Sequence, residues 1–350
     1  MPFAGGQSTI EPMEIDWRSA ILGFAGALLV LAGLVWVVGA GNVWTAIIAL
    51  RLRDVALIGA LSLTWLASWG LVLKTVLDAV EVDAGAAESV LLFSGATFAN
   101  NVTPFGQAGG EPISAYLISR STGTPYERGL AAIASVDALN FVPSIGVALA
   151  GLAYYVTVVT VGDELLFVLG VVVGLAVAVP LVVYLGWRGR RRVRETVVRT
   201  LGPVLNVVGR LLPGVSTPGP GTVRRRVDSF FGSLGLVADS RRDLAVALGF
   251  SLLGWSLMAA MLWLSLAVLG QQVPVAAVFV AVPVATIASV TPLPGGLGGV
   301  ETALVLLIVP ATSVPPAVAS AAALVYRGAT YWLPTLVGGV ALAWLEARPG

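Results

Sequence analysis

Four apolar stretches of the sequence carry no charged residue and are long enough to cross a lipid bilayer. Each contains 19 to 27 residues, and they are Ser19–Ala40, Val55–Leu73, Leu165–Trp187 and Leu244–Gly270. A helix rises about 1.5 Å per residue, so about 20 residues cross the roughly 30 Å hydrocarbon core. Inside that core a helix satisfies its own backbone hydrogen bonds. The sequence therefore predicts an all-α polytopic membrane protein.

Two further apolar regions, residues 129–162 and 315–345, are each interrupted by one charged residue and one proline. The interruptions are Asp137 and Pro143 in the first region, and Arg327 and Pro334 in the second. We expect each region to form one tilted or kinked span, with the second broken near its centre. Together with the four uncharged stretches, this gives about six full spans.

The composition of the 350 residues agrees with a membrane protein and excludes several kinds of catalytic site. Hydrophobic residues make up 57% and charged residues 11%, the mean hydropathy is +0.92, and soluble domains carry about 25% charged residues. The chain has no cysteine and no histidine, which excludes disulfides, Cys/His zinc sites, Ser-His-Asp triads and imidazole proton relays. No nucleophile–base pair and no nucleotide-binding motif is visible. We therefore expect a protein that is not an enzyme and that uses no metal or cofactor.

Positive charge is concentrated in one segment between expected spans. Of the 20 Lys and Arg residues, 12 lie between Arg188 and Arg242. Basic loops stay on the cytoplasmic side, so we expect this loop (residues 188–242) and both termini in the cytoplasm of a cell-membrane protein. The predicted organisation is a cytoplasmic tail over residues 1–18 and a single transmembrane domain over residues 19–350.

The basic loop also suggests partners. Its weak apolar stripes favour surface helices on anionic membrane lipids, although an ordinary topogenic loop has the same composition. The loop lacks the interleaved aromatic and basic residues of a folded nucleic-acid-binding module, so no nucleic acid partner is expected. The oligomeric state stays open.

Two Gly/Pro-rich breaks inside apolar sequence repeat the same features in the same order. Residues 96–111 and 285–301 both begin Ala-Thr-x-Ala, both contain Thr-Pro, and both continue to a glycine pair followed by one Glu. The spacing continues downstream, because Glu111 precedes Asp137 by 26 residues and Glu301 precedes Arg327 by 26 residues. The pattern predicts a duplication, with repeat one over about residues 19–162 and repeat two over about residues 163–345.

The apolar runs beside these breaks are too short to cross a bilayer. Ser89–Thr103 has 15 residues, which make about 22 Å of helix. We therefore expect each break to be the turn of a re-entrant helical hairpin, which needs protein or a wet cavity around its irregular backbone. The alternative is that the breaks merely kink ordinary spans. The expected turn residues are Thr103, Pro104, Gly109 and Gly110 in the first break, and Thr291, Pro292, Pro294, Gly295, Gly296, Gly298 and Gly299 in the second.

Three expected spans lie between the two hairpins. Each span takes the chain to the other side of the membrane, so after an odd number of spans the second hairpin should enter from the side opposite the first. The first hairpin should enter from the cytoplasm. Oppositely directed broken hairpins are typical of inverted-repeat transporters, whose site lies where the breaks meet near mid-membrane.

A small set of polar residues lies at or near the breaks and inside the apolar spans. Ionisable groups at that depth are costly and persist when they are paired or line a polar cavity. The candidate substrate-binding residues are Arg327, Glu301, Glu111, Asn100, Asn101 and Asp137. Arg327 can pair with any of the three carboxylates, and the sequence does not choose among them.

The chemistry of these residues allows two interpretations. Arg327 suits a phosphate or carboxylate headgroup, with Glu111 and Glu301 balancing it in the empty site or binding a coupling proton or cation. Alternatively, each Glu stabilises the start of a helix, and Arg327 belongs to a fixed structural ion pair.

The segment Thr291–Glu301, with Arg327 downstream, resembles the signature of the flippase-like transmembrane family, also called the lysylphosphatidylglycerol synthase transmembrane region. Residues 101–111, followed by Arg120, are similar to the first motif of that family, and Asp137 departs from its pattern. The resemblance extends from about Ser19 to Leu345. Because only a few residues follow the last expected span, we expect the membrane part without the soluble synthase domain.

The resemblance implies a polytopic domain that translocates lipids. Relatives include the flippase half of bifunctional aminoacyl-phosphatidylglycerol synthases and membrane domains fused to archaeal glycosyltransferases that act on dolichol phosphate. The leading hypothesis is a flippase for a phospholipid or a polyprenyl-phosphate-linked lipid. The alternatives are a non-transporting membrane subunit that anchors a glycosyltransferase, and a small organic-anion carrier.

Overall fold

The computed structural model describes residues 50–103, 107–158, 240–290 and 293–347, with a few isolated positions outside these ranges. Within these ranges every regular element is helical. Several predictions lie outside the described residues: the tail 1–18, almost all of the spans Ser19–Ala40 and Leu165–Trp187, most of the basic loop, and the turn residues Pro104, Thr291 and Pro292.

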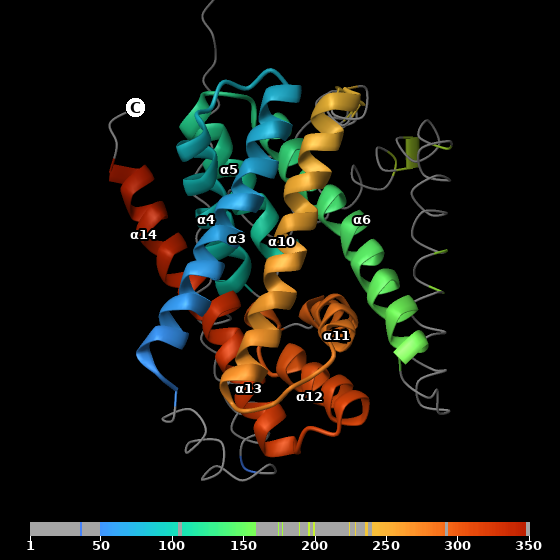
Figure 1. Ribbon diagram of the computed structural model, residues 1–350. Helices are drawn as coiled ribbons and strands as arrows, with labels where there is room; N and C mark the ends of the chain where they lie inside the picture. The colour runs from blue at the N-terminus through green and yellow to red at the C-terminus, as the bar shows by residue number, and fades with distance from the viewer. Residues whose placement is uncertain are drawn as a thin grey trace, which may run out of the picture.

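The three longest described helices each contain 28 to 33 residues. They are α3 (Leu52–Ala79), α6 (Tyr126–Val158) and α10 (Arg241–Val268). Helices α3 and α10 run antiparallel and pack along most of their length (Figure 1). The predicted spans at 55–73, 129–162 and 244–270 are confirmed as helices, and each is long and apolar enough to cross a membrane.

Five candidate membrane spans are present in the described part of the chain. Besides α3, α6 and α10, they are Pro316–Leu345, where the sequence predicts one span, and Pro294–Thr312, where it predicts the returning arm of a hairpin. An all-helical multi-pass membrane protein is thereby confirmed. The count of six full spans is not tested, because two of those spans lie almost wholly outside the described residues.

Four shorter helices form two pairs. Helix α4 (Ala86–Val102) packs against α5 (Gln107–Thr122), and α11 (Val275–Ile287) packs against α12 (Gly299–Thr312). These helices contain 13 to 17 residues, fewer than the roughly 20 that span a bilayer. The first pair lies in the upper part of the molecule and the second pair at the bottom (Figure 1).

Gly109 and Gly110 are not turn residues, contrary to the prediction. Helix α4 ends at Val102 and helix α5 begins at Gln107, so both glycines lie in the first turn of α5. A Cβ at Gly110 would overlap both the side chain and the backbone of Asn100. The glycine at position 110 thus lets α4 and α5 approach closely, as small residues do between membrane helices.

The last apolar region is one helix that contains a π-helical turn. Helix α13 (Pro316–Arg327) continues through η3 (Gly328–Trp332) into α14 (Leu333–Ala347). The Leu333 N–H donates to Gly328 O, five residues earlier, and so leaves the Ala329 carbonyl without its α-helical donor. The Ser62 hydroxyl of α3 donates to that carbonyl at 2.5 Å. The predicted break near the centre is therefore a wide turn.

Proline explains why the turn forms there. Pro334 has no N–H to donate, and in a regular α-helix its ring collides with the carbonyl four residues earlier, which here belongs to Thr330. Widening the helix just before Pro334 removes this conflict.

Aromatic residues hold α3 against its neighbours. The Trp69 ring of α3 meets those of Trp65, Phe93 and Trp255 edge-on, at centroid distances of 5.2, 6.1 and 5.6 Å. The Trp69 indole N–H also donates to Ser251 O of α10 at 3.4 Å. Edge-to-face pairs of this kind add to the stabilisation from burial, so α3, α4 and α10 form a fixed unit.

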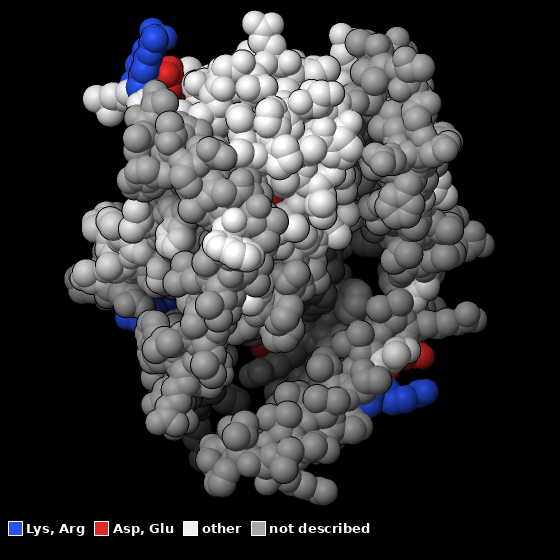
Figure 2. Space-filling view, turned by 90° about the horizontal axis from the view of Figure 1, so that it is seen from below, with Lys and Arg blue, Asp and Glu red and all other residues white. Residues whose placement is uncertain are grey.

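Charge is sparse on the described surface at the lower end of the molecule. Seen from below, white residues cover most of the described face, and blue Lys and Arg side chains show only at its rim (Figure 2). Helix α14 ends at the opposite end, on the side where α10 begins with Arg241 and Arg242 (Figure 1).

The contact between α3 and α10 depends on Gly254, where a Cβ would overlap the Trp69 indole. We expect Gly254→Ala to lower the free energy of unfolding by about 1–3 kcal/mol, the usual cost of overpacking. Gly249→Ala on the same helix is the matched control, because nothing lies within 4 Å of its Cβ position. Denaturant titrations in detergent, followed by circular dichroism, measure the difference. Equal stability of the two variants would contradict this packing.

Candidate functional site

The second break folds through three glycines in left-handed conformations. Gly295 and Gly296 lie in the short helix η2 (Pro294–Gly296), and Gly298 caps α12, with φ angles of 54°, 65° and 82°. Residues with a Cβ rarely adopt such angles. A Cβ at Gly295 would also overlap the Tyr331 ring. Of the predicted turn residues, Pro294, Gly295 and Gly296 form η2 and Gly298 caps α12, whereas Gly299 is already the first residue of that helix.

Glu301 closes this turn onto the start of α12. Its Oε2 accepts a hydrogen bond from the Gly298 backbone N–H at 2.6 Å, and the residue has no exposed surface. A carboxylate in the first turn also interacts favourably with the helix dipole. This contact agrees with the predicted structural role of Glu301, and it leaves the second carboxylate oxygen for another partner.

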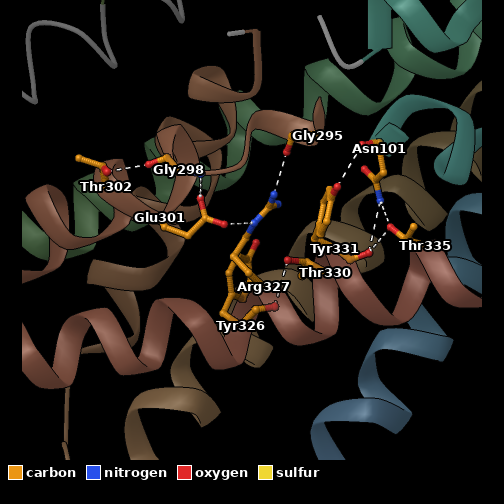
Figure 3. Close-up of polar contacts among 10 residues, drawn as sticks. All are labelled: Asn101, Gly295, Gly298, Glu301, Thr302, Tyr326, Arg327, Thr330, Tyr331 and Thr335. Atoms are coloured by element: carbon orange, nitrogen blue, oxygen red, sulfur yellow. Dashed lines mark hydrogen bonds and ion pairs between the residues drawn. The ribbon is translucent and has the colours of Figure 1, made fainter. Parts of the chain in front are cut away.

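That partner is Arg327, the last residue of α13. Its Nε donates to Glu301 Oε1 at 2.9 Å, and its Nη2 donates to Gly295 O at 2.7 Å (Figure 3). The guanidinium lies 4.7 Å from the centroid of the Tyr331 ring, and Arg327 is 8% exposed. Among the three carboxylates that the sequence left open, Arg327 pairs with Glu301.

The tip of the first helix pair reaches the same place. The Asn101 amide Nδ2 donates to Thr335 Oγ1 at 2.8 Å and to Tyr331 O at 3.4 Å, and the Tyr331 hydroxyl donates to Asn101 O at 3.1 Å (Figure 3). Helix α4 also packs on η2. The two breaks, which approach from opposite ends of the molecule (Figure 1), therefore meet at Tyr331.

Tyr331 and Thr335 are functional candidates that the sequence analysis missed. Both follow Arg327 at intervals of four residues, which is the spacing of side chains on one face of a helix. The sequence feature that could have identified them is a stripe of Arg, Tyr and Thr in an apolar span. The stripe alone does not show the contact with Asn101, which lies 230 residues away from Tyr331 in the chain.

The first repeat has a polar pair at the equivalent spacing. The Glu111 and Asp137 carboxyl groups lie close enough to interact, and both residues are half-buried. The residues of each repeat that are 26 positions apart thus contact each other, as an acid pair in one repeat and as an ion pair in the other.

Asn100 is placed apart from these contacts. It lies on α4 against Gly110, and its Oδ1 is buried without a hydrogen-bond partner among the described residues. Of the six predicted binding residues, the structure therefore brings together Arg327, Glu301 and Asn101 as one cluster and Glu111 and Asp137 as another.

This cluster can bind an anion. Its ion pair and hydrogen bonds use Nε and Nη2 of Arg327, whereas Nη1 makes no hydrogen bond with the described residues. A guanidinium offers its donors in a planar fork that suits phosphate and carboxylate. No group of three or more His, Cys, Asp and Glu side chains in the described ranges is placed to hold a metal ion.

We expect the effects of substitutions at Glu301 and Arg327 on the free energy of unfolding to be strongly coupled. Arg327→Met should lower the free energy of unfolding by about 3–5 kcal/mol, because it leaves a buried carboxylate without its partner. Adding Glu301→Gln should recover part of this loss. A double-mutant cycle in detergent gives the coupling energy.

The control is Lys74→Met, which breaks an exposed ion pair with Asp78 on α3. Exposed pairs contribute about 0–1 kcal/mol, so this variant should change stability little. Additive effects of the two substitutions at Glu301 and Arg327 would contradict a buried pair.

Comparison with known proteins identifies the family. Residues 22–338 match the family described as the lysylphosphatidylglycerol synthase TM region. A UPF0104 membrane protein of Methanothermobacter thermautotrophicus is 27% identical over 343 residues, which cover 95% of each chain. Another UPF0104 membrane protein of the same organism is 25% identical over 330 residues, covering 93% of this chain and 95% of the relative. The chain, whose sequence already resembles this family from Ser19 to Leu345, belongs to the lysylphosphatidylglycerol synthase transmembrane region family.

Proposed function

We propose that the protein is a flippase, which moves the headgroup of a phospholipid or a polyprenyl-phosphate-linked lipid across the cell membrane. The observation that carries this proposal is the meeting of two broken helix pairs, from opposite ends of the molecule, at Asn101, Gly295 and Tyr331. Transporters built from inverted repeats bind their substrates at such a junction near mid-membrane. The proposal includes about six full spans, two re-entrant hairpins and no enzymatic activity.

The two equivalent polar pairs support a duplicated architecture. Contacts between residues 26 positions apart occur in both repeats, and the helix pairs α4/α5 and α11/α12 lie at opposite ends of the molecule. A duplication whose halves face opposite sides offers one site to both leaflets in turn. The basic loop would place the first hairpin on the cytoplasmic side.

Arg327 is the proposed headgroup ligand. In the empty site Glu301 and Gly295 O hold its guanidinium, and an incoming phosphate would bind Nη1 and compete with Glu301. The competing interactions are both charge-assisted, so the exchange costs less than exposing an unpaired charge to hydrocarbon. Glu111 and Asp137, whose carboxyl groups interact, are the groups we assign to proton coupling.

Reconstitution tests the proposal directly. In liposomes that carry a fluorescent phosphatidylglycerol, wild-type protein should expose inner-leaflet label to a membrane-impermeant quencher. Arg327→Ala and Glu301→Gln should each reduce the rate at least tenfold, because the first removes the anion ligand and the second removes its counter-charge. Lys74→Gln is the charge-loss control and should retain the wild-type rate. Equal rates in all variants would reject Arg327 and Glu301 as the site.

Loop deletion separates transport from an anchoring role. Replacing residues 188–239 by a short flexible linker leaves the helix cap Ser240 and the site intact. A flippase should then keep its headgroup transport in liposomes, whereas a subunit that recruits a glycosyltransferase through this loop should lose its partner. Loss of transport in a folded deletion variant would count against a transport path confined to the described helices.

A further inference from the structure

The structure shows the proposed headgroup ligand in a closed environment. Arg327 is 8% exposed, and its neighbours Glu301 and Tyr331 have no exposed surface. A headgroup that binds a guanidinium has to lie against one edge of its planar fork, and so little exposed surface does not accommodate a headgroup. Contacts around Arg327 therefore have to open before an anion binds there.

The Tyr331 side chain contacts every part of this closed centre. The guanidinium carbon of Arg327 lies over the ring, 4.7 Å from its centroid, and a Cβ at Gly295 of the second break would overlap the ring. The hydroxyl group donates to the Asn101 carbonyl of the first break at 3.1 Å (Figure 3). One side chain thus joins the headgroup ligand to both breaks.

The contact between Tyr331 and Asn101 is reciprocal, because each side chain binds the carbonyl of the other residue. The Asn101 amide Nδ2 donates to Tyr331 O at 3.4 Å and also to Thr335 Oγ1 at 2.8 Å. Asn101 lies in the last turn of α4, where carbonyl groups have no donor within the helix. The Tyr331 hydroxyl supplies that donor and fixes the end of α4 on the last span.

Two turns earlier, α4 contacts the last span in a different way. A Cβ at Gly338 of α14 would overlap the Ser94 carbonyl and the Phe98 side chain, and Ser94 lies seven residues before Asn101. That contact is a close approach of backbone that no headgroup replaces. The contact at Asn101 consists of hydrogen bonds, which contribute little net stability where another polar group takes over. The end of α4 is therefore the part that can separate from α14.

We propose that Asn101, Tyr331 and Thr335 form a latch that closes the Arg327 site, and that the latch opens to admit an anionic headgroup. Opening separates Asn101 from Tyr331 and Thr335, and the headgroup then reaches Nη1 of Arg327. Its phosphate and hydroxyl groups replace the hydrogen bonds that opening breaks. The inference rests on the proposed function and adds to it the contact that controls access to the site.

Chemical modification of Arg327 tests the latch without any transported lipid. The probe is phenylglyoxal, which reacts with accessible guanidinium groups, applied to full-length protein in phosphatidylcholine nanodiscs, and mass spectrometry quantifies the modified residues. Tyr331→Phe keeps the ring and removes the hydroxyl, so it should raise the modification rate of Arg327 at least fivefold. Asn101→Leu should do the same from the other side of the latch. The exposed Arg120 is the internal reference and should react equally fast in all variants.

Thr330→Val is the matched control for these variants. The Thr330 hydroxyl donates to Tyr326 O within one continuous helix, so its loss should leave the modification rate of Arg327 unchanged. Equal rates in wild type, Tyr331→Phe and Asn101→Leu would overturn the latch. Equal acceleration by Thr330→Val would also overturn it, because general loosening of the helix would then explain the result.

Closing the latch covalently is the complementary measurement. The chain contains no cysteine, so a short bifunctional methanethiosulfonate joins only the thiols introduced by Asn101→Cys and Thr335→Cys. The crosslink should lower the modification rate of Arg327 at least fivefold. Reduction of the same sample should restore the rate, which distinguishes a locked protein from a misfolded one. Equal rates before and after reduction would contradict an opening at this contact.

Transport by the same samples separates this inference from the proposed function. The crosslink should stop the movement of fluorescent phosphatidylglycerol in liposomes, and reduction should restore it. Modification of Arg327 that follows the latch, combined with transport that ignores Arg327→Ala and Glu301→Gln, would keep the latch and reject the headgroup site. Transport that depends on Arg327 but continues in the crosslinked protein would keep the proposed function and reject the latch.

Discussion

The buried ion pair between Glu301 and Arg327 is the interaction on which the centre of this protein depends. Burying either charge alone would be strongly destabilising, and each side chain also binds backbone that the glycine-rich turn leaves unpaired, at Gly298 N–H and Gly295 O. The pair therefore joins the second break to the last helix. The backbone of the second break is not regular helix, and it keeps a defined conformation because its free N–H and C=O groups bind charged side chains.

The π-turn at residues 328–332 links this centre to the rest of the molecule. It frees one carbonyl for Ser62 of α3 and presents Tyr331 between Arg327 and the tip of α4. π-turns are rare, and many occur at functional sites. Here the turn brings two segments that are 230 residues apart into direct contact. The Tyr331 ring thus contacts the Arg327 guanidinium on one side and is hydrogen-bonded to Asn101 of α4.

The two repeats share a spacing and differ in chemistry. The same interval of 26 residues joins two carboxyl groups in one repeat and a carboxylate with a guanidinium in the other. One repeat therefore joins two acids, whereas the other joins an acid to a base. This asymmetry is compatible with the proposed headgroup site at Arg327.

The sequence alone determined the helical class, the positions of α3, α6, α10 and the last span, and the identity of the two breaks, because bilayer thickness and backbone hydrogen bonding leave few alternatives for long apolar segments. It also selected Glu301, Arg327 and Asn101, since polar groups in such segments stand out. It misplaced the first turn at Gly109 and Gly110, because a glycine that permits close packing and a glycine that permits a turn look alike in sequence. Only the tertiary structure chose Glu301 as the partner of Arg327 and brought Tyr331 to Asn101, because both choices depend on how distant helices pack, which local pattern does not encode.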